Sequence, residues 1–303
     1  MAKKNLKEMI KDAKKRGTNF YKFLLLIMIK MGFSNDELFP VQLRYKVYCK
    51  LRKKYAKFIK YNQCEDKKEI NKTIWVMWLQ GIDNAPLLVQ RCYQSIIEKT
   101  KGWNVILVTK QNMNEYCNIP EYIIKKWEKN IISNTHMSDI IRNDILIKNG
   151  GLWIDSTVLL TDNIPDFITE LDFFTFKHEY RYDKAVVFES WFIYSKKENP
   201  MLQETQKLLY KYWEKNNKLC EYFLFHLFFT LVAETYIKEW KCVPYFTDIT
   251  PHNLYHEIFN KFSNNRYTQI KEQSFVHKLS YKLDIPEDIT DTYYDKILKG
   301  DLD

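Results

Sequence analysis

The sequence predicts an α/β protein built on a mostly parallel sheet that is flanked by helices. From residue 72 to residue 160, short apolar runs rich in β-branched and aromatic residues alternate with helical segments. This alternation is typical of parallel strands joined by helical crossovers. The 303 residues, 46% hydrophobic and 28% charged, suffice for one large domain or two and exclude a largely disordered chain.

Strands and helices follow one another regularly in the first part of this region. The expected strands are 72–79, 103–109 and 152–160. The expected helices are 86–98, 120–129 and 138–149, the first two opened by Pro86 and Pro120. Ser138 is the expected N-cap of the third helix, and Gly150 is expected to end it.

After residue 160 the pattern becomes mainly helical. Two more strands are expected at 173–176 and 186–194, followed by helices at 200–215, 221–239 and 251–261. The sheet therefore carries a helical addition at the C-terminal end, as it does at the N-terminal end.

The basic charge of the chain is concentrated in its first 60 residues. This segment has 17 Lys and Arg against 4 Asp and Glu, whereas the remaining 243 residues have 30 against 34. Such asymmetry indicates an N-terminal segment that meets an anionic surface and argues against a nucleic-acid-binding body. We expect a basic helical segment at 1–62 and a second domain at 63–303, with the polar stretch 62–69 at the boundary.

Within this basic segment, the apolar run Phe23–Ile29 is far shorter than the roughly 20 residues that span a bilayer. No small-residue cleavage site follows it, so a signal peptide is not expected. Two interpretations remain: a helix that lies in the membrane interface, or one that packs on the main domain and exposes a basic face. The six cysteines form no C-x-x-C pair, which indicates reduced thiols in a cytosolic protein.

The predicted helix 138–149 carries a candidate polar pair. Asp139 and Arg142 are three residues apart, so their side chains share one helix face. Taken alone, this pair has the ordinary interpretation of a surface ion pair. Directly after the helix, Gly150-Gly151 is expected to reverse the chain.

The apolar strand that follows this reversal ends at Asp155, with Ser156 and Thr157 next to it. In open parallel sheets, ligands bind at the carboxyl ends of strands. A buried aspartate without a partner is costly, so a metal, a hydroxyl or an arginine is expected near Asp155. Although Asp155 alone could cap a turn, its combination with the helix pair and the double glycine favours a binding site.

Residues 136–158, H-M-S-D-I-I-R-N-D-I-L-I-K-N-G-G-L-W-I-D-S-T-V, resemble the core of the capsular polysaccharide synthesis glycosyltransferases. This family is related to glycosyltransferase family 32. The resemblance extends from residue 70 to residue 282, because four more segments occur in the family's order: 72–81, 189–192, 221–226 and 276–279. It implies a GT-A fold, a Rossmann-like sheet that binds a nucleotide-sugar and a divalent cation, and a transfer that retains the anomeric configuration.

The resemblance also implies roles for individual residues. The catalytic and sugar-holding side chains would be Asp139, Arg142 and Asp155. The other donor-binding residues would be Trp78 near the base, Gln80, Ser156, His277 and Lys278. The metal, Mn²⁺ or Mg²⁺, would bind Asp155 and His277.

This sequence departs from the family's D-x-D motif, which here reads Asp155-Ser156-Thr157. Thr157 stands where the second acid, normally the direct metal ligand, is expected. Because hard cations prefer carboxylate oxygens, this change should weaken the metal or move its coordination to other groups.

The resulting prediction is a retaining hexosyltransferase with a nucleotide-sugar donor, UDP-linked by default, and a lipid-linked glycan acceptor. It would act in capsule or surface polysaccharide synthesis, held by residues 1–60 at the inner face of the cell membrane, with no nucleic acid partner. The alternatives are a glucosylating effector that modifies a protein and a non-catalytic peripheral membrane protein.

Overall fold

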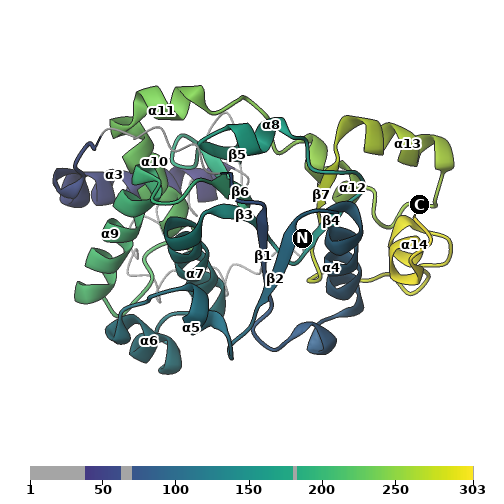
Figure 1. Cartoon of the computed structure of the whole chain (residues 1–303), viewed down its shortest axis with the longest axis horizontal. Coiled ribbons are helices and arrows are strands. Elements are labelled where there is room, and N and C mark those ends of the chain that lie inside the picture. The colour runs from purple at the N-terminus through teal and green to yellow at the C-terminus, as the bar shows by residue number, and fades with distance from the viewer. Residues whose placement is uncertain (1–37, 63–69, 180–182, 303) are drawn as a thin grey trace, which may run out of the picture.

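The computed structural model describes residues 38–62, 70–179 and 183–302. A five-stranded sheet in the order β2-β1-β3-β6-β5 lies at its centre (Figure 1). Its strands are β1 (Thr73–Met77), β2 (Asn104–Val108), β3 (Gly151–Ile154), β5 (Phe173–Lys177) and β6 (Phe188–Ser195). β1 is parallel to β2 and β3, and β6 is antiparallel to its neighbours β3 and β5. β6 alone therefore runs antiparallel to the other four strands. This arrangement confirms the predicted α/β fold with a mostly parallel sheet.

Helices cover both faces of this sheet (Figure 1). The longer ones are α3 (Leu38–Tyr55), α4 (Leu87–Lys99), α6 (Glu121–Glu128), α7 (Asn134–Asn149), α9 (Pro200–Lys215), α10 (Leu224–Thr235), α11 (Ile237–Cys242), α13 (Asn264–Gln273) and α14 (Tyr293–Lys299). Shorter turns are η1 (Ala56–Phe58), η2 (Ile82–Asn84), α5 (Met113–Tyr116), α8 (Phe167–Glu170), η3 (Thr250–His252) and α12 (Asn253–His256).

The strands divide their side chains between two cores. Trp75 and Trp153 lie in the core that contains α7, α9 and α10, whereas Ile74, Leu152 and Ile154 lie in the core that contains α4. Successive side chains of a strand point to opposite faces, so this alternation buries both sides of the sheet. The two-sided burial explains why the strands appear in the sequence as nearly continuous apolar runs.

The prediction of one continuous strand at 152–160 is wrong, because the structure has two short strands there. β3 ends at Ile154, and β4 (Val158–Leu160) pairs with β7 (Val276–Lys278) in a separate antiparallel sheet. A turn separates them, in which the amide of Val158 donates to the carbonyl of Asp155 at 3.0 Å. The apolar pattern continues across this turn because both short strands are buried.

The expected N-cap Ser138 is also wrong. α7 begins one turn earlier, and the side chain of Ser133 accepts a hydrogen bond from the amide of His136 at 3.2 Å. Ser133 satisfies an amide that would otherwise have no partner in the first helical turn. Gly150 ends the helix as predicted, with φ of 68°.

Gly151 allows β3 to approach β1 closely. It has φ of 95°, and a Cβ atom there would lie 2.5 Å from the carbonyl oxygen of Thr73. We expect Gly151→Ala to lower the free energy of unfolding by more than the about 1–3 kcal/mol that backbone strain alone costs. Gly102→Ala is the matched control in denaturant unfolding, because Gly102 has φ of 90° and nothing within 4 Å of the Cβ position. Equal losses in both variants would contradict the close approach.

After residue 200, two of the three predicted helices are interrupted or shorter in the structure. Helix 200–215 is confirmed as α9, but the expected helix 221–239 is two helices, α10 and α11. The expected helix 251–261 is limited to η3 and α12. α13, β7 and α14 were not predicted; their boundaries depend on tertiary pairing and packing, which local periodicity does not show.

α3 packs on the body of the protein. The ring of Tyr55 lies 5.2 Å from that of Phe228 in α10, Tyr48 donates a hydrogen bond to Glu234, and Arg44 pairs with Asp183. The run Phe23–Ile29 lies outside the described residues, and the domain boundary at 62 stays a prediction. No described helix combines the length and hydropathy needed to cross a bilayer.

Candidate functional site

Arg142 joins two carboxylates at the carboxyl end of β3. Its Nη1 donates to Oδ1 of Asp139 at 2.7 Å, and its Nη2 donates to Oδ1 of Asp155 at 2.7 Å. The guanidinium lies over the ring of Trp153, 5.0 Å from its centroid, and the side chain is 4% exposed. The face of α7 and the end of β3 therefore meet, as the spacing of these residues predicts.

Lys278 brings a second cation to Asp155. Its Nζ lies 3.2 Å from Oδ2 of Asp155 and 2.5 Å from the hydroxyl oxygen of Thr157. The pairing of β7 with β4 places Lys278 opposite Val158, directly after this turn. Trp153 adds a hydrogen bond from Nε1 to Oδ1 of Asp155 at 2.9 Å.

These contacts decide the charge of Asp155. Burial alone would raise its pKa, but Arg142 and Lys278, with the hydrogen bonds from Trp153 and Lys278, outweigh burial and lower the pKa to about 2. Asp155 is therefore ionised at neutral pH. The stability from these contacts is present above the unfolded pKa of 3.8 and is lost as the pH falls through about 2.

His277 does not face Asp155. Its Nε2 lies 3.0 Å from the hydroxyl oxygen of Thr161, and burial lowers its pKa to about 4, so the ring is neutral. Because adjacent residues of a strand point to opposite faces, β7 can direct only one of His277 and Lys278 toward Asp155, and it directs Lys278. Ser156 lies half-buried in the turn between β3 and β4.

Two more of the residues predicted to bind the donor, Trp78 and Gln80, follow β1. Trp78, half-buried after β1, contacts Tyr281 edge-to-face at 5.4 Å, and Gln80 is exposed two residues further on. Tyr222 is exposed at its outer edge, and partial desolvation, followed by the charges of Asp139 and Asp155, raises its pKa. Tyr281 was not predicted as a site residue, and Tyr222 appeared only within the segment 221–226, because isolated tyrosines carry no spacing signal.

Two buried histidines lie near Asp139. Nε2 of His136 accepts a hydrogen bond from Trp213 at 3.0 Å, so its proton is on Nδ1, which lies 3.5 Å from Oδ2 of Asp139. Burial lowers the pKa of His226 to about 4, against the smaller raising effect of Asp139. His226 is thus a neutral ring near this acid. The sequence motif contains His136, but only the contact with Trp213 fixes its orientation.

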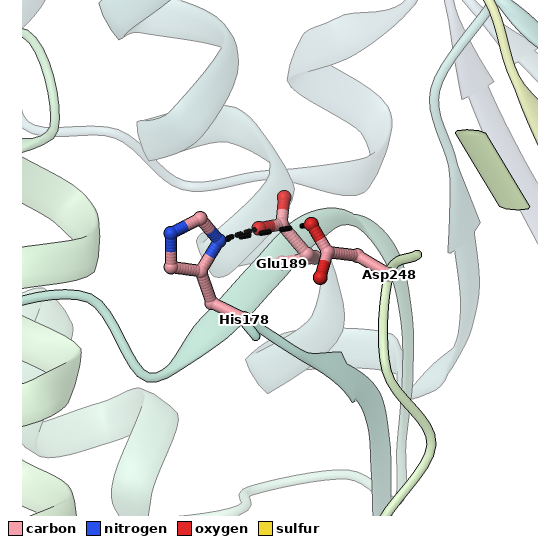
Figure 2. A group of neighbouring side chains, drawn as sticks. All are labelled: His178, Glu189 and Asp248. Carbon is pink, nitrogen blue, oxygen red and sulfur yellow. Dashed lines mark hydrogen bonds and ion pairs between the residues drawn. The ribbon is translucent and has the colours of Figure 1, made fainter. Parts of the chain in front are cut away.

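A second cluster consists of His178, Glu189 and Asp248, which converge from the end of β5, from β6 and from the loop before η3 (Figure 2). Nδ1 of His178 lies 2.5 Å from Oε1 of Glu189 and 3.7 Å from Oδ2 of Asp248. Burial lowers the pKa of His178, but the two carboxylates outweigh burial and raise it. The two acids of the cluster therefore favour the protonated form of His178.

We expect the His178 cluster to make stability depend on pH. Because the folded pKa of His178 is raised, its contribution is fully present below the unfolded value of 6.5 and is lost as the pH rises through the folded pKa. The difference in unfolding free energy between the wild type and His178→Gln should therefore shrink as the pH increases. Denaturant unfolding across this range measures it, and a difference independent of pH would contradict the assignment.

The contacts around Asp155 do not suit a divalent cation. Asp155 is the one carboxylate in the motif, both of its oxygens accept hydrogen bonds from cations, and His277 is directed to Thr161. Among the described residues, the group with three ligand atoms within 4.8 Å of one another is His178, Glu189 and Asp248. The expected metal at Asp155 and His277 thus stays a prediction that the local geometry does not favour.

Comparisons with known proteins place the chain in a family. No curated protein matches. A solved structure described as "PaToxG Glycosyltransferase" shares 15% identity over 66% of this chain and 78% of its own, with a TM-score of 0.39. Another, described as the structure of a transferase mutant with two cysteines replaced by serine, shares 13% over 59% and 91%, with a TM-score of 0.34. Neither likeness carries a conclusion about activity. The family described as "Capsular polysaccharide synthesis protein" matches residues 28–297, so the chain belongs to the capsular polysaccharide synthesis protein family.

Proposed function

We propose that this protein is a retaining glycosyltransferase of the GT-A type that transfers a hexose from a nucleotide-sugar, UDP-linked by default, to a lipid-linked glycan acceptor. Its product would enter capsule or another surface polysaccharide. The supporting observation is the chain of contacts Asp139–Arg142–Asp155–Lys278 at the carboxyl end of β3. Two acids and two cations at this edge of the sheet match the hydroxyls and phosphates of a nucleotide-sugar.

The carboxylates would hold the donor by its hydroxyl groups. Arg142 fixes the orientation of Asp139, which is 8% exposed, and of Asp155, which is half-buried at the strand end, and each would accept a hydrogen bond from a sugar hydroxyl. The aromatic rings of Trp78, Tyr222 and Tyr281 offer apolar faces to the base or the sugar. Firm holding contributes to rate by orienting the anomeric carbon toward the acceptor.

The leaving diphosphate develops negative charge as its bond to the sugar breaks. Fixed positive groups aimed at that charge lower the barrier, and Lys278 and Arg142 are the cations closest to Asp155. Retention would follow if the acceptor hydroxyl entered from the face that the diphosphate leaves.

A donor screen tests the proposed function. Water can replace the acceptor, so the protein should release a nucleoside diphosphate from one nucleotide-sugar in a panel of UDP- and GDP-sugars. The same donor should raise its melting temperature, since a ligand that binds only the folded state stabilises it. Transfer to a lipid-linked glycan rather than to a protein distinguishes the proposal from a glucosylating effector. No hydrolysis and no stabilisation with any donor would contradict both.

We also propose that the basic N-terminal segment holds the protein at the inner face of the cell membrane. In the described part of this segment, Lys50, Lys53 and Lys54 are exposed on α3. Each should contribute about 1 kcal/mol to binding of an anionic surface, roughly fivefold in affinity. The triple Lys→Ala variant should lose affinity for vesicles containing phosphatidylglycerol in flotation assays, whereas Lys261→Ala should not. Equal binding to phosphatidylcholine vesicles would contradict the proposal.

A further inference from the structure

We propose that the ammonium of Lys278 takes the place of a divalent cation, so that donor binding and transfer proceed without metal. This inference rests on the proposed function and concerns the same site. A cation bound through the first and third residues of Asp155-Ser156-Thr157 would have to lie between these two side chains. Nζ of Lys278 lies there, 3.2 Å from Asp155 and 2.5 Å from Thr157.

The ligands near this position select a monovalent organic cation. Asp155 supplies one negative charge, and Arg142 and Lys278 already contact its two oxygens. Thr157 is neutral and 7% exposed, and its oxygen accepts a hydrogen bond from Lys278. Mg²⁺ and Mn²⁺ prefer carboxylate oxygens and would be repelled by two adjacent cations. A site with a single carboxylate is therefore matched to the single positive charge of Lys278 rather than to a divalent ion.

The fold holds Lys278 in this position through main-chain contacts. β7 pairs with β4 so that Lys278 faces Val158, and the amide of Leu279 donates to the carbonyl of Thr157 at 2.9 Å. An ammonium has three N–H donors. Two of them reach Asp155 and Thr157, which leaves the third for a phosphate oxygen of the donor. The side chain is 21% exposed, so the ammonium is accessible to a ligand.

The bonds, electron pair and proton of the transfer step can all be accounted for without a metal. The bond between the anomeric carbon and the phosphate oxygen breaks, and its electron pair passes to that oxygen. The acceptor oxygen forms a new bond to the anomeric carbon, and its proton moves to the departing phosphate. Lys278 supplies a permanent positive charge beside this phosphate and keeps its own proton, as stabilisation of a developing anion requires.

Binding experiments test this inference separately from the proposed function. Protein dialysed against EDTA should bind the nucleoside diphosphate with the same affinity in excess Mn²⁺ and in excess EDTA, as measured by calorimetry. Donor hydrolysis should likewise proceed at one rate in both. Binding or hydrolysis that requires Mn²⁺ overturns the inference but leaves the proposed function standing. Absence of binding and hydrolysis in both conditions overturns both.

The measurement is repeated in Asp248→Asn, which disables the other group of potential metal ligands, His178, Glu189 and Asp248 (Figure 2). An ion bound by that cluster could otherwise be mistaken for one bound at Asp155. Wild-type protein and Asp248→Asn should both be indifferent to Mn²⁺ in nucleoside diphosphate binding. A Mn²⁺ requirement in either protein overturns the inference, and one that persists in Asp248→Asn assigns the ion to the donor site.

Substitution of the lysine itself gives the sharpest result. Lys278→Ala should lose about 10²- to 10³-fold in hydrolysis rate, the usual cost of removing one group that stabilises a developing anion. Lys196→Ala is the matched control, because Lys196 pairs with Asp172 at 2.7 Å next to the end of β6 that lies beside Gly151, away from Asp155. Wild-type affinity and rate in Lys278→Ala would overturn the inference.

A double variant is designed to restore a metal ion to the position that Lys278 occupies. Thr157→Asp combined with Lys278→Ala supplies a second acid and removes the competing ammonium. We expect it to regain nucleotide affinity and hydrolysis in Mn²⁺ but not in EDTA. Cooperative unfolding like that of the wild type shows that the double variant is folded. If Mn²⁺ then restores neither nucleotide affinity nor hydrolysis in it, the lysine and the metal do not share one position, and the inference is overturned.

Discussion

Arg142→Ala should lower the free energy of unfolding by about 3–5 kcal/mol, the cost of removing one partner from a buried ionic network. Arg142 is 4% exposed and donates to Asp139 and Asp155 at 2.7 Å each. Its removal leaves two carboxylates in a poorly solvated site. The pKa of Asp155 should also rise, because Arg142 is the strongest of the groups that lower it.

Denaturant unfolding checks this expectation, with Arg266→Ala as the control. Arg266 forms a similar pair with Glu257, but its side chain is 37% exposed, so water replaces the lost contact and the change should be much smaller. Arg142→Lys should give an intermediate result, since an ammonium keeps the charge but lacks the planar fork that reaches both acids. Similar losses for Arg142→Ala and Arg266→Ala would show that the network between α7 and β3 does not stabilise the fold.

The sequence predicts this network only in part, and the reason is physical. Helical spacing places Asp139 and Arg142 on one face, and the apolar run before Asp155 indicates a strand end; both features are local. The third partner, Lys278, is 123 residues from Asp155, and its position depends on the pairing of β7 with β4. Periodicity shows which side chains are buried but not which strands pair, so only the family resemblance pointed to Lys278.

The same limit explains the largest error in the predicted fold. The run 152–160 is apolar at most positions, because β3 is buried in the central sheet and β4 is buried in the second one. Nothing in the pattern marks the change of sheet. The break becomes clear only from the hydrogen bond that closes the turn, and this turn directs the side chain of Thr157 toward Lys278.

Asp155→Asn is expected to reduce kcat/KM for donor hydrolysis by about 10²- to 10³-fold while the protein stays folded. Asparagine keeps the shape of the side chain, and its carbonyl oxygen can still accept a hydrogen bond from Trp153. The negative charge is lost, however, so Arg142 retains one acid, Asp139, and Lys278 retains Thr157. Both cations then become free to move from the positions in which they would meet the diphosphate.

Asp172→Asn provides the comparison for Asp155→Asn, because Asp172 pairs with Lys196 at 2.7 Å but is 56% exposed and lies away from Asp155. Steady-state kinetics with the preferred nucleotide-sugar should show wild-type values for Asp172→Asn and a loss mainly in kcat for Asp155→Asn. A loss confined to KM would assign Asp155 to ground-state binding alone. A folded Asp155→Asn variant with unchanged kcat/KM would contradict the proposed glycosyltransferase site, since both of its cations, Arg142 and Lys278, are positioned around that one carboxylate.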